Sequence, residues 1–372
     1  MSEWNEVRLG ELIDINPETL SISKYNGRIQ YIDISSVNCG QLDGYTEYDI
    51  SDAPSRARRI IRNNDIIYST VRPNLRAYYY VKDCPDNAIC STGFAVLRAK
   101  DNVDSRFVYS LVTENSFVDY LSLVAKGSAY PAADTADFKK AKVTVPDLPT
   151  QNRIADILSG YDDLIENNNR RIALLEKAAQ ELYKEWFVRF RFPGHETAKF
   201  ENGLPVGWVY GRLSSIMSFG AGKERPSSGS IYPVYGGNGI LDYCDSYNNE
   251  NAIIIGRVGA YCGSVYYEPE KCWISDNALY AISKNNAIYF NYYMLKHLNL
   301  NARQVGTGQP LITQGVLNKI KTIIPSNPLI HKYNSLVSDL LLQQRYLKQK
   351  NESLTKQRDL LLPRLMSGKL EV

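Results

Sequence analysis

The chain has 372 residues, of which 44% are hydrophobic and 22% charged, and its formal net charge is +3. This composition is typical of a globular protein with room for two domains, and it argues against a fibrous or disordered chain. The near-neutral charge also argues against an extended basic surface, so any contact with nucleic acid must come from local clusters.

Membrane insertion and metal binding are the next classes that the sequence argues against. No apolar run reaches the roughly 18 residues of a membrane span, and the start, MSEWNEVRLGEL, lacks the basic and apolar regions of a signal peptide. We therefore expect a cytoplasmic protein without membrane contact. The six cysteines form no close C-x-x-C pair and only three histidines are present, so we expect free thiols and no metal site.

Residues 1–149 predict a first globular domain of short strands and turns. One helix is expected over residues 105–123. The expected strands are β-rich runs bounded by Gly, Pro, Asn and Asp, at residues 27–37, 65–71, 77–81, 93–98 and 142–145.

Arginines cluster between the expected strands of this domain. Arg is the side chain suited to bidentate contact with guanine edges or phosphate, so the cluster supplies the candidate DNA contacts of the first half. The alternative is a solvated surface on which these side chains pair with nearby acids. The candidates are Arg56, Arg58, Arg59, Arg62, Arg72 and Arg76.

Residues 150–192 predict one long helix with a single apolar stripe. About 40 residues at 1.5 Å each span roughly 60 Å, so the stripe needs a partner helix of equal length. Ile157 and Leu164 lie beside the seven-residue ladder, within the apolar stripe. Asn168 falls on the ladder itself, where it fixes the register of the helix pair or else faces solvent. The ladder consists of Ile154, Tyr161, Leu175 and Leu182.

A second globular domain is expected within residues 193–327, after a connector at 191–203. Its strands run into Gly-rich turns, where backbone N–H groups can approach a phosphate closely. The candidate DNA contacts are Gly236, Gly237, Asn238, Arg257 and Tyr261. The Gly pattern at 220–223 lacks phosphate-loop spacing, and no paired-carboxylate or Asn-Pro-Pro-Tyr motif is present, so we expect no catalytic residue.

Residues 328–372 predict the partner helix, and they reveal an internal repeat. Their ladder consists of Leu340, Leu347, Leu354 and Leu361. An offset of 179 positions places Leu340 on Tyr161, and the same offset matches Pro131 with Pro310. The starts of the halves match at larger offsets, as Trp4 does with Trp208 at 204 and residues 65–71 do with 252–258 at 187. The repeat is a globular domain followed by a helix, twice.

The whole chain resembles the specificity subunit of a type I restriction-modification system. The resemblance rests on the order and double occurrence of short pieces: residues 232–240, 255–261, 275–278 and 306–310, with 127–131 and 146–154 in the first half. The chain departs from the family at Ile330-His331, where a Glu-Gln pair is common. These pieces add four candidate DNA contacts, Ser128, Tyr130, Thr307 and Gln309.

The resemblance implies an α+β fold and a division of labour. Two mixed α/β target-recognition domains, at 1–149 and 193–327, would each read half of a split double-stranded DNA target. Two spacer helices, at 150–192 and 328–372, would form an antiparallel coiled coil with pseudo-twofold symmetry. This coiled coil would set a gap shorter than one DNA turn of about 34 Å. Unequal domains imply an asymmetric target.

The resemblance also implies partners and a non-catalytic role. Two modification subunits would bring S-adenosylmethionine chemistry for adenine methylation, and restriction subunits would use ATP with Mg for cleavage, while this chain would bind no cofactor itself. Helix docking is expected on the charged outer faces, with solvated surface as the alternative. Examples are Asp162, Asp163, Glu166, Arg170, Lys177, Gln344, Lys348, Asn351 and Arg358.

Two other functions stay open at this point. A coiled-coil adaptor without DNA binding would fit the near-neutral charge, and a specificity subunit of a different defence assembly would have the same sequence pattern. The DNA target and gap length do not follow from the sequence, because they depend on which loop side chains reach base edges.

Overall fold

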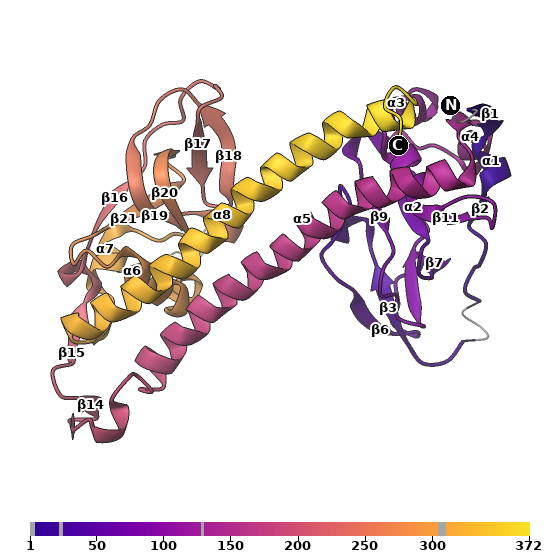
Figure 1. Ribbon diagram of the computed structural model, residues 1–372. Helices are drawn as coiled ribbons and strands as arrows, with labels where there is room; N and C mark the ends of the chain where they lie inside the picture. Colours follow the sequence, from indigo (N-terminus) through magenta and orange to yellow (C-terminus); the bar gives the residue numbers. More distant parts are fainter. Residues whose placement is uncertain (1–3, 22–24, 128–129, 304–309) are drawn as a thin grey trace. The chain divides into compact units, whose positions relative to one another are not determined.

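The computed structural model describes residues 4–21, 25–127, 130–303 and 310–372 (Figure 1). The chain divides into two compact units, Met1–Asn168 with Lys350–Val372, and Asn169–Gln349. Two long helices, α5 (Leu148–Tyr183) and α8 (Asn327–Met366), each contribute to both units. No described helix combines the length and apolar character that a membrane span requires.

The first unit is built around two four-stranded sheets (Figure 1). One has the order β2 (Ile13–Ile15), β11 (Phe94–Ala99), β8 (Ile66–Ser69), β9 (Tyr78–Tyr80). The other has the order β6 (Thr46–Asp49), β3 (Arg28–Ile32), β10 (Ala88–Ser91), β7 (Ala57–Ile60). The smaller elements are β4 (Val37–Asn38), β5 (Gln41–Leu42), α1 (Leu9–Leu12), α2 (Ser105–Thr113), α3 (Asn115–Val124) and α4 (Thr135–Lys140).

Two local predictions for this unit were wrong. The single helix expected over 105–123 is two helices, because Glu114 is extended, with ψ 147°, and separates α2 from α3. This break lets Phe107 of α2 and Phe117 of α3 bury in one core. The arginine-rich segment expected between strands contains a strand, β7, whose Ala57 and Ile60 are buried or half-buried.

The second unit contains one six-stranded sheet, with helices α6 (Ile288–His297) and α7 (Gln314–Lys319). Its order is β16 (Met217–Ala221), β21 (Ala278–Ser283), β19 (Asn249–Gly256), β20 (Val265–Ile274), β17 (Tyr232–Gly236), β18 (Gly239–Cys244). A further short pair is β13 (Phe200–Glu201) with β14 (Leu204–Pro205). Its core receives Trp186 and Phe187 from η4, a π-helical turn (Lys184–Val188) that follows α5.

Both units contain the same two-stranded ribbon in the same register. β1 (Asn5–Arg8) pairs antiparallel with β12 (Lys142–Val145), matching Arg8 with Lys142. β15 (Val209–Arg212) pairs antiparallel with β22 (Lys321–Ile324), matching Arg212 with Lys321. In both halves of the repeat, the strand at the start of the domain therefore pairs with the strand that precedes the long helix.

The two long helices run antiparallel. In the first unit, Arg358 Nη1 lies 2.7 Å from Asp162 Oδ1, and Asn168 Nδ2 donates to Asn351 Oδ1 at 2.8 Å. In the second unit, the Gln344 amide donates to the carbonyl of Ile172 at 3.3 Å, and the Tyr333 hydroxyl to that of Ala179 at 2.9 Å. As the residue number rises along α5, the residue number of its partner on α8 falls.

The predicted ladder lies along the seam between the helices. Ile154 and Leu347 are buried, with 1% and 4% of their surface exposed. The other ladder residues are half-buried: Tyr161, Leu175, Leu182, Leu340, Leu354 and Leu361. Ile157 and Leu164, expected within the apolar stripe beside the ladder, are instead 39% and 48% exposed, because a two-helix seam covers only a narrow face.

The seam also contains polar residues that were expected on the outer face. Asp162, Gln344, Asn351 and Arg358 are half-buried and bond across to the other helix, so assigning them to a docking surface was wrong. Asn168 is 4% exposed, which excludes the alternative that it faces solvent.

Candidate nucleic-acid interface

A loop that leaves strand β8 of the first domain is tied to a distant segment by backbone hydrogen bonds. Thr70 N–H donates to Gly93 O at 2.9 Å, Arg72 N–H to Pro131 O at 2.7 Å, and Ala133 N–H to Thr70 O at 2.9 Å. Val71 and Ala132 form an isolated antiparallel bridge between these bonds. We call residues 70–72, 93 and 131–133 the first clamp.

The second domain contains the same arrangement after strand β19. Arg257 N–H donates to Asn277 O at 3.1 Å, Gly259 N–H to Pro310 O at 3.2 Å, and Ile312 N–H to Arg257 O at 2.9 Å. Val258 and Leu311 form the matching bridge. We call residues 257–259, 277 and 310–312 the second clamp.

The two clamps account for two of the three offsets in the repeat, 187 and 179. Val71 and Val258 are 187 positions apart, whereas their bridge partners Ala132 and Leu311 are 179 apart. Each clamp joins one segment from either side of the variable interior. The backbone frame is therefore shared, while the intervening sequence differs.

The first clamp brings together two of the predicted contacts. The Arg72 guanidinium carbon lies 4.8 Å from the centroid of the Tyr130 ring, and 72% of Tyr130 is exposed. Arg72 leads into a 3-10 turn, η3 (Pro73–Leu75), where Leu75 is 59% exposed. Arg56 lies beside this clamp, because its carbonyl accepts from Thr92 N–H, next to Gly93.

The other predicted arginines of the first domain have partners within the fold. Arg59 Nη1 donates to Thr19 Oγ1 at 3.3 Å, and Arg58 Nη1 to Ala57 O at 2.9 Å. Arg62 Nη2 lies 2.6 Å from Glu18 Oε2, and hydrogen bonds from Arg98 and Arg62 lower the pKa of Glu18. These three arginines stabilise the domain framework around β7.

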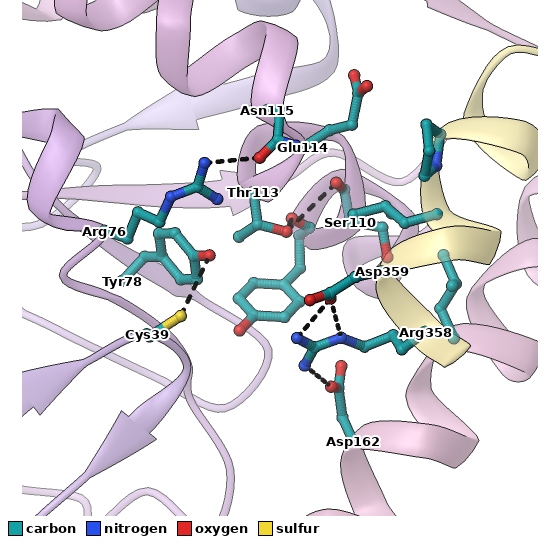
Figure 2. A pocket seen from close by; sticks show the side chains of 14 residues that line it. Cys39, Arg76, Tyr78, Ser110, Thr113, Glu114, Asn115, Asp162, Arg358 and Asp359 are labelled. Carbon is teal, nitrogen blue, oxygen red and sulfur yellow. Dashed lines mark hydrogen bonds and ion pairs between the residues drawn. The ribbon is translucent and has the colours of Figure 1, made fainter. Parts of the chain in front are cut away.

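Arg76 also turns toward the fold. Its Nη2 donates to Asn115 Oδ1 at 2.6 Å, at the start of α3, and it lines a cavity of about 140 Å³ in the first unit (Figure 2). Figure 2 shows Arg358 in the same cavity, between Asp162 and Asp359. Burial raises the pKa of Asp162, and the nearby Arg358 opposes this shift.

The second clamp brings together Gly237, Arg257 and Asn277. A Cβ on Gly237 would lie 3.7 Å from both Asn277 O and Val258 O, and Ser264 Oγ donates to Gly237 O at 2.5 Å. Arg257 is half-buried and its Nη1 donates to Asp276 O at 3.3 Å.

The remaining predicted contacts of the second domain divide by exposure. Tyr261 is 52% exposed in the 3-10 turn η7 (Gly259–Tyr261), and Asn238 is exposed at the β17–β18 hairpin. Gly236 is buried within β17. Ser128, Thr307 and Gln309 lie outside the described residues.

Sequence reasoning missed two clamp positions, Thr70 and Asn277. The offset of 187 that matches residues 65–71 with 252–258 already pairs Thr70 with Arg257, so the signal was present. Within the described ranges, no group of three or more His, Cys, Asp or Glu residues is placed to hold a metal ion. The six cysteines are free thiols, of which Cys39 is exposed.

Two α+β domains on one repeated plan, each followed by a long helix of an antiparallel pair, define a duplicated recognition scaffold. The chain belongs to the family described as the type I restriction modification DNA specificity domain, whose family model matches residues 1–177 and 205–356. The two matches correspond to the two halves of the repeat.

Individual relatives agree with this assignment, and one solved structure has the same fold. The chain is similar to the type I restriction enzyme MjaIX specificity subunit of Methanocaldococcus jannaschii, with 28% identity over 79% of this chain and 75% of that protein. It is also similar to the HindI specificity subunit of Haemophilus influenzae, with 30% identity over 51% of this chain and 42% of that protein. A crystal structure of the type I restriction-modification S subunit from M. genitalium has the same fold, with a TM-score of 0.60, 20% identity, and coverage of 98% of this chain and 96% of that one. The chain is thus a DNA-recognition subunit of the type I restriction-modification class.

Proposed function

We propose that this chain reads an asymmetric bipartite DNA target, one half with each domain, and that α5 and α8 keep the gap between the halves constant. The two clamps carry this proposal. They share their backbone hydrogen bonds, yet their side chains differ, with Thr70 against Arg257 and Gly93 against Asn277. Two clamps with the same backbone hydrogen bonds but different side chains suit two domains that recognise different base sequences.

Arginine provides the main chemistry of recognition in this proposal. Its guanidinium can donate two parallel hydrogen bonds to O6 and N7 of guanine in the major groove. Arg72 and Arg257 are the clamp arginines, and Arg56 and Tyr261 would contact the DNA backbone. Since the net charge is only +3, local contacts rather than a broad basic surface must supply the affinity.

The proposal includes partners that supply the chemistry. Two modification subunits would dock on the helices and bind S-adenosylmethionine, and restriction subunits would bind ATP with Mg, while this chain would perform no catalytic step. Apolar side chains on the outward faces of the helices support docking, because exposed leucines on a helix form a groove-binding surface. They are Leu164, Leu174, Leu342, Tyr346 and Leu360, each 48–66% exposed.

Adenine-methylation mapping tests the bipartite target. DNA would be sequenced from cells that express this chain with its modification subunit, with and without exchange of residues 204–327 for another second domain. We expect a two-part motif in which the exchange changes only one half. The matched control exchanges the same residues for a domain from a subunit with a known identical half-site, which should leave the motif unchanged.

Two results would contradict the proposal. A domain exchange that changes both halves together would exclude independent readers. A well-expressed complex that methylates no specific motif, in a chain that also fails to bind duplex DNA directly, would favour a coiled-coil adaptor.

A further inference from the structure

One long stretch of the second half contains cations without acids. Residues 277–338 include six Lys or Arg residues and no Asp or Glu. The equivalent stretch of the first half at the offset of 179, residues 98–159, contains eight Lys or Arg and eight Asp or Glu residues. The net charge of +3 therefore conceals a local excess of positive charge in the second domain. Such an excess is typical of a surface that binds a polyanion.

Cations from separate segments of this domain gather around the 3-10 turn η6 (Leu213–Ser215). Arg212 is the register partner of Lys321 in the β15–β22 ribbon. Lys284 Nζ donates to the carbonyl of Ser214, within the turn, at 2.8 Å. We call the exposed cations of this surface the basic ribbon: Arg212, Lys284, Lys319 and Lys321.

The opposed cations in the basic ribbon do not stabilise the fold. Like charges directly opposite on antiparallel strands repel, so Arg212 and Lys321 weaken the pairing of β15 with β22. The first ribbon has the equivalent cation pair, but there Glu6 Oε1 lies 2.7 Å from Lys142 Nζ and offsets one of the charges. At the offset of 204, Tyr210 replaces Glu6 and is 69% exposed. A bound anion would relieve in the second ribbon the repulsion that Glu6 relieves in the first.

Helix α7 connects the second clamp with the basic ribbon. The clamp ends at Ile312, and α7 covers Gln314–Lys319, so its last residue belongs to the basic ribbon. Six helical residues span roughly 9 Å, which is about three charges along one DNA strand at 3.4 Å each. A DNA strand whose bases lie at the clamp would therefore bring its phosphates within reach of these side chains. This proximity favours DNA over an acidic protein surface as the bound anion.

We propose that the basic ribbon binds DNA phosphates beside the second half-site. This inference rests on the proposed function and deepens it. Lys and Arg contacts to phosphate position a protein on the duplex and supply affinity without reading bases. The second domain thus combines a base-reading clamp with a backbone anchor, whereas the first ribbon, with its charges offset, contributes less to DNA affinity.

The salt dependence of DNA binding tests the proposal. The full-length chain in complex with its modification subunit would be titrated with a duplex that carries the mapped motif, and with a scrambled duplex, at a series of salt concentrations. The double variant Arg212→Gln, Lys321→Gln should reduce the slope of log K against log salt by about 1.8, because each lost phosphate contact contributes about 0.9. Both duplexes should be affected alike, and the methylated motif should keep its sequence.

Two further variants separate phosphate binding from a structural role. The matched control, Arg8→Gln with Lys142→Gln, removes the equivalent cation pair of the first ribbon and should change the slope much less. Lys321→Glu places an acid opposite Arg212, so it should raise the Tm while it weakens binding to both duplexes. A purely structural role predicts instead that stability and DNA binding change in the same direction.

Two results would overturn the proposal. The first is an unchanged salt slope in Arg212→Gln, Lys321→Gln; if assembly with the modification subunit is weakened instead, as measured by size-exclusion chromatography, the ribbon binds an acidic protein surface. The second is an equal slope change in the first-ribbon control, which would indicate a general effect of charge. Failure of the bipartite function itself is distinguishable, because the wild-type complex would then produce no two-part motif before any variant is examined.

Discussion

The first and second clamps have the same backbone hydrogen bonds, yet most of their side chains differ. The seam between α5 and α8 shows the same contrast: Asn168 bonds Asn351 in the first unit, whereas the equivalent residues in the second, at the offset of 179, are Leu347 and Ile172. In the clamps and in the seam, the equivalent side chains can differ because the backbone arrangement does not depend on them. The two halves therefore differ in the side chains of the clamps and of the seam, while the backbone hydrogen bonds of the clamps are the same.

The largest expected effect comes from truncating the helix ends that fill the two cores. The ring centroid of Phe187 lies 4.9 Å from that of Phe290 and 5.2 Å from that of Tyr333. Phe187→Ala should therefore lower the free energy of unfolding by about 3–5 kcal/mol. Leu365→Ala, at the end of α8 in the first core, should lower it by about 2–5 kcal/mol. Urea unfolding monitored by circular dichroism measures both. Leu174→Ala, 63% exposed on α5, is the control and should change little.

A smaller effect is expected at the strand end before the second clamp. A Cβ on Gly256 would lie 2.2 Å from Tyr261 O, whereas the equivalent residue of the first domain is Ser69, whose hydroxyl donates to Val71 O. Gly256→Ala should lower stability by about 1–3 kcal/mol and weaken the second half-site, because the backbone must move. Thermal unfolding and methylation mapping check the two effects. If Gly256→Ala changed neither the stability nor the second half-site, then position 256 would not require glycine.

The buried asparagine pair sharpens the comparison of the two seam layers. Asn168→Leu removes the amide that donates to Asn351 Oδ1 in the seam, which should cost about 1–3 kcal/mol. Adding Asn351→Leu should recover most of this loss, because the layer then resembles that of Ile172 and Leu347. A double-mutant cycle by denaturant unfolding measures the coupling. Additive losses in the double variant would show that the asparagines do not act as a pair.

The smallest effect concerns the arginine framework around β7. Arg98 and Arg62 lower the pKa of Glu18 in the folded state below its ordinary 4.5, so this carboxylate stabilises the fold at neutral pH. That contribution is lost as the pH falls below 4.5 and through the lowered value. Since about a third of the side chain is exposed, we expect less than about 1 kcal/mol. Glu18→Gln should remove the contribution at pH 7 and flatten the acid limb of the stability curve; an unchanged limb would contradict the assignment.

Several features of the fold and the site followed from the chain alone, and others did not. The seven-residue ladder predicted both long helices, and the repeat predicted that the two halves share one plan. The break at Glu114 was missed, because residues on both sides favour a helix and only the packing of Phe107 with Phe117 requires the turn. Arg72 and Tyr130 were both named as contacts, but their stacking could not be foreseen.

The sequence by itself determined the duplication, the helix pair and the family, because heptad spacing and repeat offsets are properties of residue order. Tertiary structure decided which polar side chains belong to the framework. Arg62 could be assigned to the framework only once Glu18, distant in the chain, was placed beside it. Arg358 and Asp162 likewise belong to the seam because the antiparallel helices bring them within 2.7 Å. Ion pairs and stacked rings form between residues far apart in the chain, so only the folded arrangement shows which arginines hold the framework together.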